Sequence, residues 1–409
     1  MVAPAPIHDR DAVPRPIEDE PSRAIAVQLP TSMLAYARSP VRWRTQCEVT
    51  VLRDGGPTFH AMLDAITHAK ESICLETYIL ASDTTGDRFK LALVERARAG
   101  VKVRLIYDSV GSFGISDAWV DDLRTAGIEV IDFNPISPWR RKFRLSHRDH
   151  RKILVVDDEV GFTGGLNIAN DYAPVDEGGA GWHDMHCMVR GPIVYDMARL
   201  FRRNWIRSGG AAYPPVSRKT VETPGEGESY VRLLENTKRR NRATFRRAYL
   251  HVIRAAREFV RIENAYFLPD RGLRRALISA AARGVDVQII VPGRSDVRII
   301  EWASLYVLRY LARRGIRIWR WRGVMMHAKT ATIDAIWSTI GSYNFDSQSR
   351  FNNLEVTIEI LDPKVGNELV RVFDTVVPNC EPYDESVWKA LPWWTKAMAW
   401  VGYRLRRFL

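Results

Sequence analysis

Five residues suited to catalysis recur, in the same order and spacing, in two eighteen-residue windows of the chain. HRKILVVDDEVGFTGGLN occupies residues 150–167, and HAKTATIDAIWSTIGSYN occupies residues 327–344. The positions that agree are His150 with His327, Lys152 with Lys329, Asp157 with Asp334, Gly164 with Gly341, and Asn167 with Asn344. A single histidine is more often structural than catalytic. A matched polar set in two copies instead indicates an active site.

The histidines and lysines are spaced to act together. HRKILVV has the composition of a β-strand, on which alternate side chains share a face, so His150 and Lys152 point the same way. The same spacing holds for His327 and Lys329. Two copies supply two imidazoles, two ammonium groups and two carboxamides, a set that suits a phosphodiester. One histidine can attack phosphorus while the other protonates the leaving alcohol, and the lysines and asparagines can stabilise the charged oxygens.

These groups predict a phosphohistidine intermediate and neither a metal nor a cofactor, because the lysines carry the positive charge. Asp157 and Asp334 are assigned to the catalytic set, although each stands where a strand enters a turn and a structural hydrogen-bonding role fits equally well. The residues expected to bind phosphate are Asn167, Asn344, Gly165 and Ser342.

Two carboxylates are predicted to orient the histidines. A histidine that acts through one ring nitrogen needs an acceptor on the other. When the two copies are aligned on Pro192 and Pro363, the residues eight positions earlier are Asp184 and Glu355. We expect one of them to hold each histidine. Metal binding by the nearby His183, His186 and Cys187 is not expected, since His183 and His186 face opposite ways on a strand.

The rest of the chain repeats in the same register. CLETYIL (residues 74–80) corresponds to RIENAYFL (261–268), and ARAGVKVRLIYD (97–108) corresponds to AARGVDVQIIVP (281–292). Strands alternating with helices predict an α/β fold of two similar lobes, each a mixed, largely parallel sheet flanked by helices. The expected boundaries are a flexible N-terminal tail at 1–40, lobes at 41–207 and 230–378, a linker at 208–229, and a basic aromatic segment at 379–409.

H-x-K-x4-D followed by G-[GS]-x-N, twice in one chain, resembles the phospholipase D superfamily. Within that superfamily the chain is most similar to the bacterial cardiolipin synthases. The segments that carry this similarity are GGLNIANDY, WHD (182–184), GSYNFDSQS and the NLE that ends at Glu355. This resemblance implies one active site between two lobes with pseudo-twofold symmetry, a phosphohistidine and no metal requirement. Gln348 departs from the arginine that those enzymes commonly carry. Many of them also begin with transmembrane helices, which are not seen here, so a peripheral membrane mode is expected.

Composition and charge indicate the partners. The chain has 409 residues, 46% of them hydrophobic, and a net charge of +12, which favours nucleic acid or an anionic membrane surface as partner. Basic stretches lie at 138–152 and at 237–259, where Phe245, Tyr249 and Ile253 fall on one side of an expected helix. The C-terminal ALPWWTKAMAWVGYRLRRFL combines tryptophans with cations, as in-plane membrane anchors do. The alternative is a terminal helix docked on the protein's own core.

We therefore expect a cardiolipin synthase-type phosphatidyltransferase, bound peripherally to the cytoplasmic side of a bacterial cell membrane. His150 would attack a phosphatidyl donor, such as phosphatidylglycerol, and His327 would protonate the departing glycerol; this order is what the resemblance suggests. The expected partners are anionic phospholipids, phosphatidylglycerol and cardiolipin, at a membrane surface, and nucleic acid is not favoured. The alternatives are a hydrolytic phospholipase D and a nucleic-acid phosphodiesterase of the same superfamily.

Overall fold

A computed structural model of the chain describes residues 28–39, 41–135, 147–215, 226–237 and 243–406. Residues 1–27 of the expected tail, 138–146 of the first basic stretch, 216–225 of the expected linker and 238–242 of the second basic stretch lie outside the described residues.

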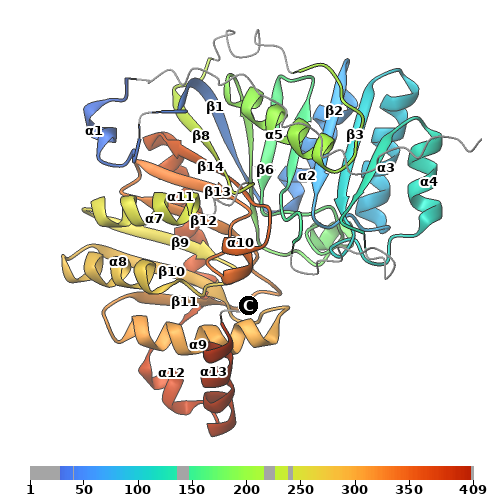
Figure 1. Cartoon of the computed structure of the whole chain (residues 1–409). Helices are drawn as coiled ribbons and strands as arrows, with labels where there is room; N and C mark the ends of the chain where they lie inside the picture. The colour runs from blue at the N-terminus through green and yellow to red at the C-terminus, as the bar shows by residue number, and fades with distance from the viewer. Residues whose placement is uncertain (1–27, 40, 136–146, 216–225, 238–242, 407–409) are drawn as a thin grey trace, which may run out of the picture.

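The described strands form one fifteen-stranded sheet in the order β15-β11-β10-β9-β12-β13-β14-β8-β1-β7-β6-β5-β2-β3-β4 (Figure 1). The strands of the first lobe are β1 (Arg44–Arg53), β2 (Ser72–Thr77), β3 (Lys102–Asp108), β4 (Glu129–Phe133), β5 (Ile153–Val156), β6 (Val160–Gly164) and β7 (Met185–Arg190). Those of the second lobe are β8 (Ser229–Glu235), β9 (Phe259–Asn264), β10 (Asp286–Pro292), β11 (Arg317–Trp321), β12 (Lys329–Ile333), β13 (Trp337–Gly341), β14 (Val356–Leu361) and β15 (Cys380–Pro382).

The strand order confirms the repeat. Outward from the β8–β1 pair, the first lobe runs β1-β7-β6-β5-β2-β3-β4 and the second runs β8-β14-β13-β12-β9-β10-β11, so corresponding strands occupy corresponding places. The two α/β lobes and the mixed sheet are confirmed. The expectation that the sheet is largely parallel was wrong: among the described strands, only β2-β3-β4 and β9-β10-β11 are parallel. The motif strands return as antiparallel hairpins, β5–β6 and β12–β13, because short turns join them. Pseudo-twofold symmetry remains an expectation.

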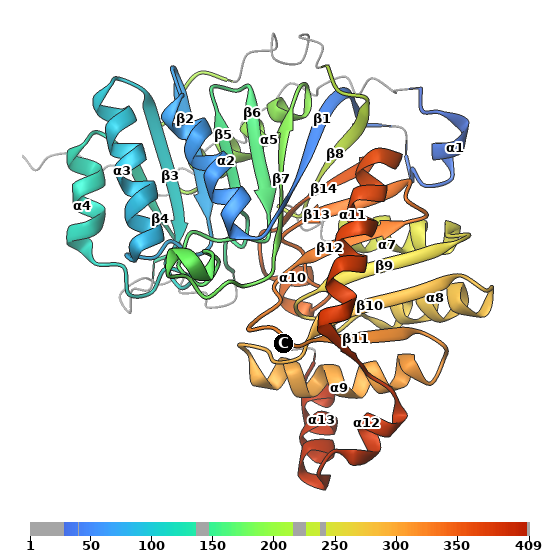
Figure 2. The ribbon, with the colours of Figure 1, turned by 180° about the vertical axis from the view of Figure 1, so that it is seen from behind.

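Helices cover both faces of the sheet. In the first lobe they are α2 (Gly55–Thr67), α3 (Thr84–Arg98), α4 (Asp117–Thr125), the 3-10 turn η1 (Val175–Glu177) and α5 (Ile193–Arg207). In the second lobe they are α7 (Thr244–Ala255), α8 (Arg271–Ala282), α9 (Arg298–Ala312), α10 (Ser347–Phe351), α11 (Pro363–Val376) and the turn η3 (Val377–Asn379). Helix α5 lies in front of the sheet in Figure 1, while α2 and α11 lie in front in the reverse view (Figure 2).

The hydrophobic core joins the lobes. One cluster of buried side chains packs α2–α4 on the first lobe, and another packs α7–α9 on the second. A third cluster draws on both, with Met197 and Phe201 of α5 and Leu369 and Phe373 of α11 in the same apolar body. Strands β1 and β8 also pair directly across the junction. The lobes are therefore one packed unit, in which burial of apolar surface resists their separation.

Both ends of the described chain belong to the second lobe. The helix α1 (Thr31–Leu34) is followed by Tyr36, which is buried and donates to Asp334 at 2.6 Å, so residues 28–39 of the expected tail pack on the second lobe. The C-terminal segment begins with β15, which pairs with β11, and continues as α12 (Glu385–Ala390) and α13 (Trp393–Leu405). The expected separate segment at 379–409 thus starts inside the sheet, because Cys380–Pro382 extends its edge.

Candidate active site

The two motif histidines face each other between the lobes. Their ring centroids lie 6.5 Å apart. Each main chain is held by the opposite lobe, since the His150 amide donates to the Leu354 carbonyl at 3.0 Å and the His327 amide donates to the His183 carbonyl at 2.7 Å. The two half-sites predicted from the repeated windows therefore form one site.

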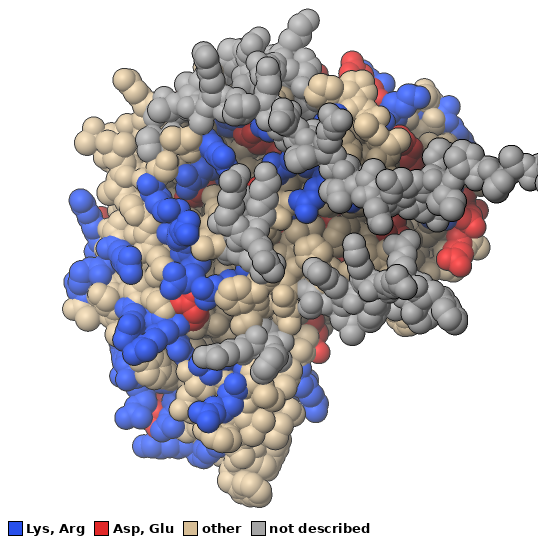
Figure 3. Space-filling view, viewed as in Figure 1, with Lys and Arg blue, Asp and Glu red and all other residues tan. Residues whose placement is uncertain are grey.

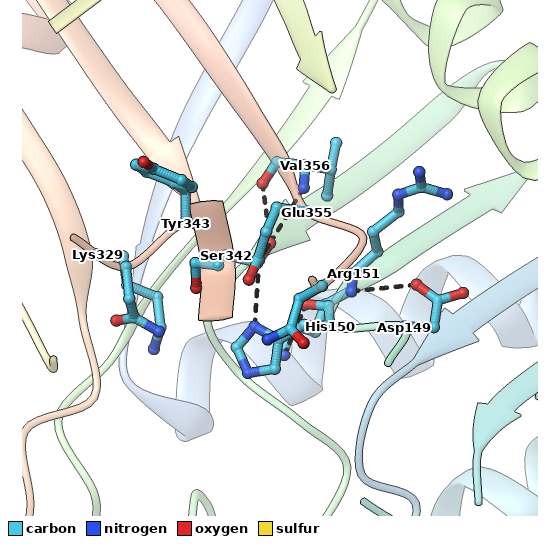
Figure 4. Close-up of polar contacts among 12 residues, drawn as sticks. Asp149, His150, Arg151, Lys329, Ser342, Tyr343, Glu355 and Val356 are labelled. Carbon is cyan, nitrogen blue, oxygen red and sulfur yellow. Dashed lines mark hydrogen bonds and ion pairs between the residues drawn. The ribbon is translucent and has the colours of Figure 1, made fainter. Parts of the chain in front are cut away.

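The carboxylates that orient these histidines are exchanged between the lobes. Nδ1 of His150 lies 3.2 Å from Oε2 of Glu355, which comes from the second lobe (Figure 4). Nδ1 of His327 lies 2.7 Å from Oδ2 of Asp184, which comes from the first lobe. A carboxylate on Nδ1 fixes the tautomer in which Nε2 is unprotonated and can act on a substrate. The structure thus places both predicted carboxylates against the histidines.

The motif lysines are buried beside the histidines. Nζ of Lys152 donates to the carbonyl of His150 at 2.9 Å, and Nζ of Lys329 donates to the carbonyl of His327. Burial, with a contribution from the charge of Lys329, lowers the pKa of Lys152 to about 7. Burial also lowers the pKa of Lys329 to about 8, although Asp184 opposes it. An added anion would restore both charges, so the site is poised to bind one.

The two histidine–carboxylate pairs differ electrostatically. Burial raises the pKa of Glu355 to about 7, against the opposing effects of the Ser342 hydroxyl and Lys152. Burial acts the same way on Asp184, but Lys329 and His327 outweigh it and lower the pKa of that carboxyl. The pKa of His150 falls well below its usual value because of burial and the neighbouring lysines. The pKa of His327 is also lowered by burial and Lys329, but Asp184 counteracts the shift.

The two motif asparagines lie at the site but are held differently. Oδ1 of Asn167 accepts from the Ile79 amide at 3.1 Å, and its Nδ2 donates to the Tyr172 hydroxyl at 2.7 Å. Oδ1 of Asn344 accepts from the Tyr266 amide at 3.3 Å. Nδ2 of Asn344 donates to none of the described residues. Asn344 is therefore the better placed of the two to donate to a phosphate oxygen.

The motif aspartates do not lie with the histidines, and their contacts favour the structural hydrogen-bonding role over the catalytic one. Asp157 accepts from the amides of Lys70, Glu71 and Ser72, each at 2.8 Å. Asp334 accepts from the amides of Arg257, Glu258 and Phe259 at 2.8–2.9 Å. Both have a φ of 53°, in turns at the far ends of β5 and β12. At about 3.3 Å per strand residue, each carboxylate lies roughly 20 Å from its motif histidine.

Gly165 and Ser342, which were expected to bind phosphate, lie against the two carboxylates. A Cβ at Gly165 would lie 2.1 Å from Oδ1 of Asp184, so glycine leaves room for that carboxylate. At the equivalent place Ser342 donates its hydroxyl to Oε2 of Glu355 (Figure 4). The matched glycines one position earlier leave room for the neighbouring strands β7 and β14. A Cβ at Gly164 would collide with His186, and one at Gly341 would collide with Thr357.

Aromatic residues that were not among the predicted site residues surround the histidines. The ring of Tyr78 lies 4.8 Å from that of His150, and the rings of Tyr172, Trp182 and Tyr266 lie 5.6, 6.1 and 6.2 Å from that of His327. The Tyr172 hydroxyl is also 3.2 Å from Nδ1 of His327. Tyr78 and Tyr266 lie in the repeated segments 74–80 and 261–268, just after β2 and β9, and that shared position was the available signal.

Another buried histidine, His183, carries a charge and lies next to Asp184 in the chain. Nδ1 of His183 lies 2.6 Å from Oδ1 of Asp54, and Nε2 lies 3.3 Å from Oε1 of Glu263 in the other lobe. Burial alone would lower the pKa of His183, but these hydrogen bonds outweigh it and raise the pKa to about 10. The Asp54 amide in turn donates to the Asp184 carbonyl at 2.9 Å. His183 is thus a cationic link between the lobes next to the catalytic carboxylate.

Comparison with known proteins identifies the same two halves. A family model described as "Cardiolipin synthase, PLD-like domain" matches residues 62–205 and 249–377. The "Cardiolipin synthase" of Geobacillus thermodenitrificans is 33% identical over 374 residues, which cover 91% of this chain and 74% of that protein. "Cardiolipin synthase 2" of Bacillus anthracis is 32% identical over 329 residues, which cover 80% of this chain and 64% of that protein.

The fold is shared with a more distant enzyme. The crystal structure of phosphatidylserine synthase from Haemophilus influenzae superimposes with a TM-score of 0.68 at 14% sequence identity, and the match covers 90% of this chain and 97% of that one. At this identity the likeness concerns the fold alone.

We predict that Asp157 contributes to stability rather than to turnover. Asp157→Ala removes three hydrogen bonds to a carboxylate and should lower the free energy of unfolding by about 2–4 kcal/mol. The neighbouring Asp158, which also has a positive φ, provides the control Asp158→Ala. Denaturant unfolding and hydrolysis of a soluble phosphodiester are measured on both. Loss of hydrolysis in a fully stable Asp157→Ala protein would restore a catalytic role.

Proposed function

The chain belongs to the cardiolipin synthase family with PLD-like domains, and from this we propose that it is a cardiolipin synthase-type phosphatidyltransferase. The observation that carries the proposal is the pair of histidines, 6.5 Å apart, each held by a carboxylate of the opposite lobe and flanked by buried lysines. Such a pair supplies a nucleophile and a proton carrier on either side of one phosphorus atom.

The first half-reaction transfers a phosphatidyl group to the enzyme. Nε2 of His150 attacks the phosphorus of phosphatidylglycerol, forming a P–N bond as the P–O bond to glycerol breaks. His327 gives its proton to the glycerol oxygen. Lys152, Lys329 and Asn344 donate to the non-bridging oxygens, where negative charge accumulates in the transition state.

The second half-reaction returns the phosphatidyl group to a lipid. A hydroxyl of a second phosphatidylglycerol attacks the same phosphorus and passes its proton to His327. A new P–O bond forms, the P–N bond to His150 breaks, and cardiolipin leaves. His327 is then protonated again, ready for the next donor, so the cycle needs no further proton source.

The asymmetry of the two pairs supports this order. An attacking imidazole must be neutral, and the pKa of His150 lies well below its usual value because of burial and the neighbouring lysines. An acid needs a partner that stabilises the imidazolium, and His327 has Asp184, whose pKa is lowered by Lys329 and His327 against the effect of burial. The shorter distance, 2.7 Å against 3.2 Å, also favours the charged pair at His327.

The C-terminal helix is the part of the described surface best suited to a membrane. Helix α13 packs on α9 through Thr395, Ala399 and Gly402, whose small side chains permit close approach. Its opposite side exposes Trp393 and Trp400, with 80% and 52% of their surfaces accessible. Docking on the protein's own core and presenting an aromatic face are therefore compatible.

Charge and hydropathy support a peripheral attachment. Lysine and arginine gather over α8 and α9, next to a mostly uncharged patch toward α13 (Figure 3). No helix in the described parts of the chain is long and apolar enough to cross a bilayer. Interfacial tryptophans beside cations favour an anionic surface. We propose that the protein binds the cytoplasmic face of a bacterial membrane, in contact with phosphatidylglycerol and cardiolipin, through α13.

The transferase proposal predicts the products from labelled phosphatidylglycerol in liposomes, with a chelator present. Cardiolipin and glycerol should form in equal amounts, and His150→Ala should abolish both. The control is His68→Ala, an exposed histidine on the surface of the first lobe, which should leave the rate unchanged. Phosphatidic acid as the main product would instead identify a hydrolytic phospholipase D. Cleavage of DNA without lipid turnover would replace the proposal with a nucleic-acid phosphodiesterase.

The membrane proposal predicts a separate effect for the exposed tryptophans. Replacing Trp393, Trp394 and Trp400 with alanine should weaken binding to phosphatidylglycerol vesicles about tenfold or more, because interfacial aromatic area is lost. Hydrolysis of a soluble phosphodiester should be retained. Vesicle co-sedimentation measures the first and a chromogenic assay the second. The exposed Leu91 of α3, on the first lobe, gives the control Leu91→Ala. Unchanged sedimentation of the tryptophan variant would exclude α13 as the attachment site.

A further inference from the structure

A second polar cavity lies on the second lobe, outside the histidine site. Its volume is about 980 Å³, within the range of roughly 300–1,000 Å³ usual for small-molecule sites. The start of α8, the helices α9 and α10 and the end of α13 enclose it. Five arginines and two aspartates contribute to its wall, together with tyrosine and phenylalanine rings.

The arginines of this cavity exceed its carboxylates. Asp270 is already neutralised, because it contacts Arg246 and lies 2.8 Å from Nη1 of Arg350. Asp346 accepts from the Ser349 amide at 2.6 Å, and burial raises its pKa to about 7. Arg271 and Arg275 are exposed and make no side-chain hydrogen bond or ion pair with any described residue. The cavity is therefore cationic at neutral pH.

Two further arginines are fixed against an aromatic ring. Nη1 of Arg274 donates to the hydroxyl of Tyr403 at 2.9 Å, and the guanidinium of Arg406 lies 3.9 Å from the centre of the same ring. These contacts hold the guanidinium groups in place while leaving other N–H donors available. Guanidinium groups bind phosphate oxygens in a forked geometry, and preorganised ones lose less entropy on binding. Leu268, Leu273 and Phe351 add apolar surface for the rest of a ligand.

The cavity adjoins both the catalytic site and the membrane-facing helix. Asn344 belongs to the catalytic site, while its neighbours Tyr343 and Phe345 line the cavity, so one short segment separates the two. On the other side, Tyr403 of α13 and Arg406, which follows the helix, contribute to the wall, and α13 exposes Trp400 one turn before Tyr403. A lipid that meets α13 at the bilayer surface is thus next to the cavity.

We propose that this arginine-lined cavity binds the phosphate and glycerol of a second anionic glycerophospholipid, which serves as the acceptor in the transfer. The assignment of acceptor rests on the proposed function, whereas binding of the headgroup does not. The donor's phosphorus reacts between the histidines, and the acceptor's phosphate is held by Arg271, Arg274, Arg275 and Arg406. The cavity would thereby distinguish a phospholipid acceptor from water or a simple alcohol.

The test compares two pairs of substitutions in the cavity with a matched pair outside it. Arg274→Gln with Arg406→Gln removes the fixed guanidinium groups. Arg271→Gln with Arg275→Gln removes the exposed ones, which make no side-chain hydrogen bond or ion pair with the described residues, and so covers the case in which the first variant does not fold. The control is Arg247→Gln with Arg254→Gln, which removes two charges from α7.

Each variant is assayed for cardiolipin formation from phosphatidylglycerol and for hydrolysis of a soluble phosphodiester. Each cavity variant should raise the KM for phosphatidylglycerol about tenfold or more, because charge-assisted hydrogen bonds are lost. Hydrolysis of the soluble compound should match that of the control. Equal KM values for phosphatidylglycerol in the cavity and control variants would overturn the proposal.

A binding experiment distinguishes the failure of this proposal from the failure of the proposed transferase activity. Short-chain phosphatidylglycerol and inorganic phosphate are titrated into the His150→Ala protein, with and without the cavity substitutions. The lipid should bind more tightly than phosphate, and the cavity substitutions should weaken it. If phosphate alone depends on the cavity, the headgroup assignment is wrong. If no cardiolipin forms with wild-type protein while lipid binding still depends on the cavity, the transferase proposal fails and the lipid site stands.

Discussion

The site depends on the exchange of carboxylates between the lobes: His150 is held by Glu355 and His327 by Asp184. Neither lobe alone contains a histidine with its orienting partner. The exchange requires the lobes to stay in register, and three features provide this. Strands β1 and β8 pair across the junction, α5 and α11 share one hydrophobic core, and the amide of each histidine donates to a carbonyl of the other lobe.

The cationic His183, placed between Asp54 and Glu263, adds a buried ionic link beside Asp184. Breaking such a buried ion pair from one side is costly, which favours a single arrangement of the two lobes.

Burial gives the duplicated groups different properties. Two lysines, two histidines and two carboxylates share a space largely closed to water, so each charge depends on its neighbours. One difference between the copies lies beside the carboxylates, where Gly165 makes room for Asp184 and Ser342 donates to Glu355. Asp184 has a lowered pKa, and Glu355 has a pKa of about 7. Two lobes of similar strand order can in this way support the proposed division, in which one histidine attacks and the other transfers the proton. In the proposed mechanism, the substrate phosphate favours the charged form of the two lysines, whose pKa values burial lowers.

The repeated windows predicted the lobes and the paired histidines and lysines, because corresponding residues occupy corresponding strands. The two carboxylates lie outside the windows and came from aligning the copies on Pro192 and Pro363. The sequence could not show which carboxylate meets which histidine, since this depends on how the lobes face each other. Asp157 and Asp334 are matched in both windows, as the histidines are, yet they accept hydrogen bonds from the amides at the starts of β2 and β9. A residue that recurs in both copies can therefore serve either catalysis or stability, and the sequence alone does not show which. Gly165 and Ser342 were assigned to phosphate because the sequence does not reveal that β7 and β14 bring a carboxylate against them. The cavity at α8 and α13 joins segments more than a hundred residues apart, and no local pattern predicts it.

The central claim is that Glu355, through its contact with His150, makes that histidine the nucleophile. It is tested most directly by quenching the enzyme during turnover at a series of pH values and locating the phosphorylated histidine by mass spectrometry. The adduct should be on His150, and its rate of formation should rise through about pH 7, where Glu355 becomes the anion that stabilises the imidazolium formed by attack. In Ser342→Gly, which copies Gly165, the carboxylate loses a donor that lowers its pKa, so the midpoint should move to higher pH. An adduct on His327, or a midpoint that is the same in both proteins, would contradict the account.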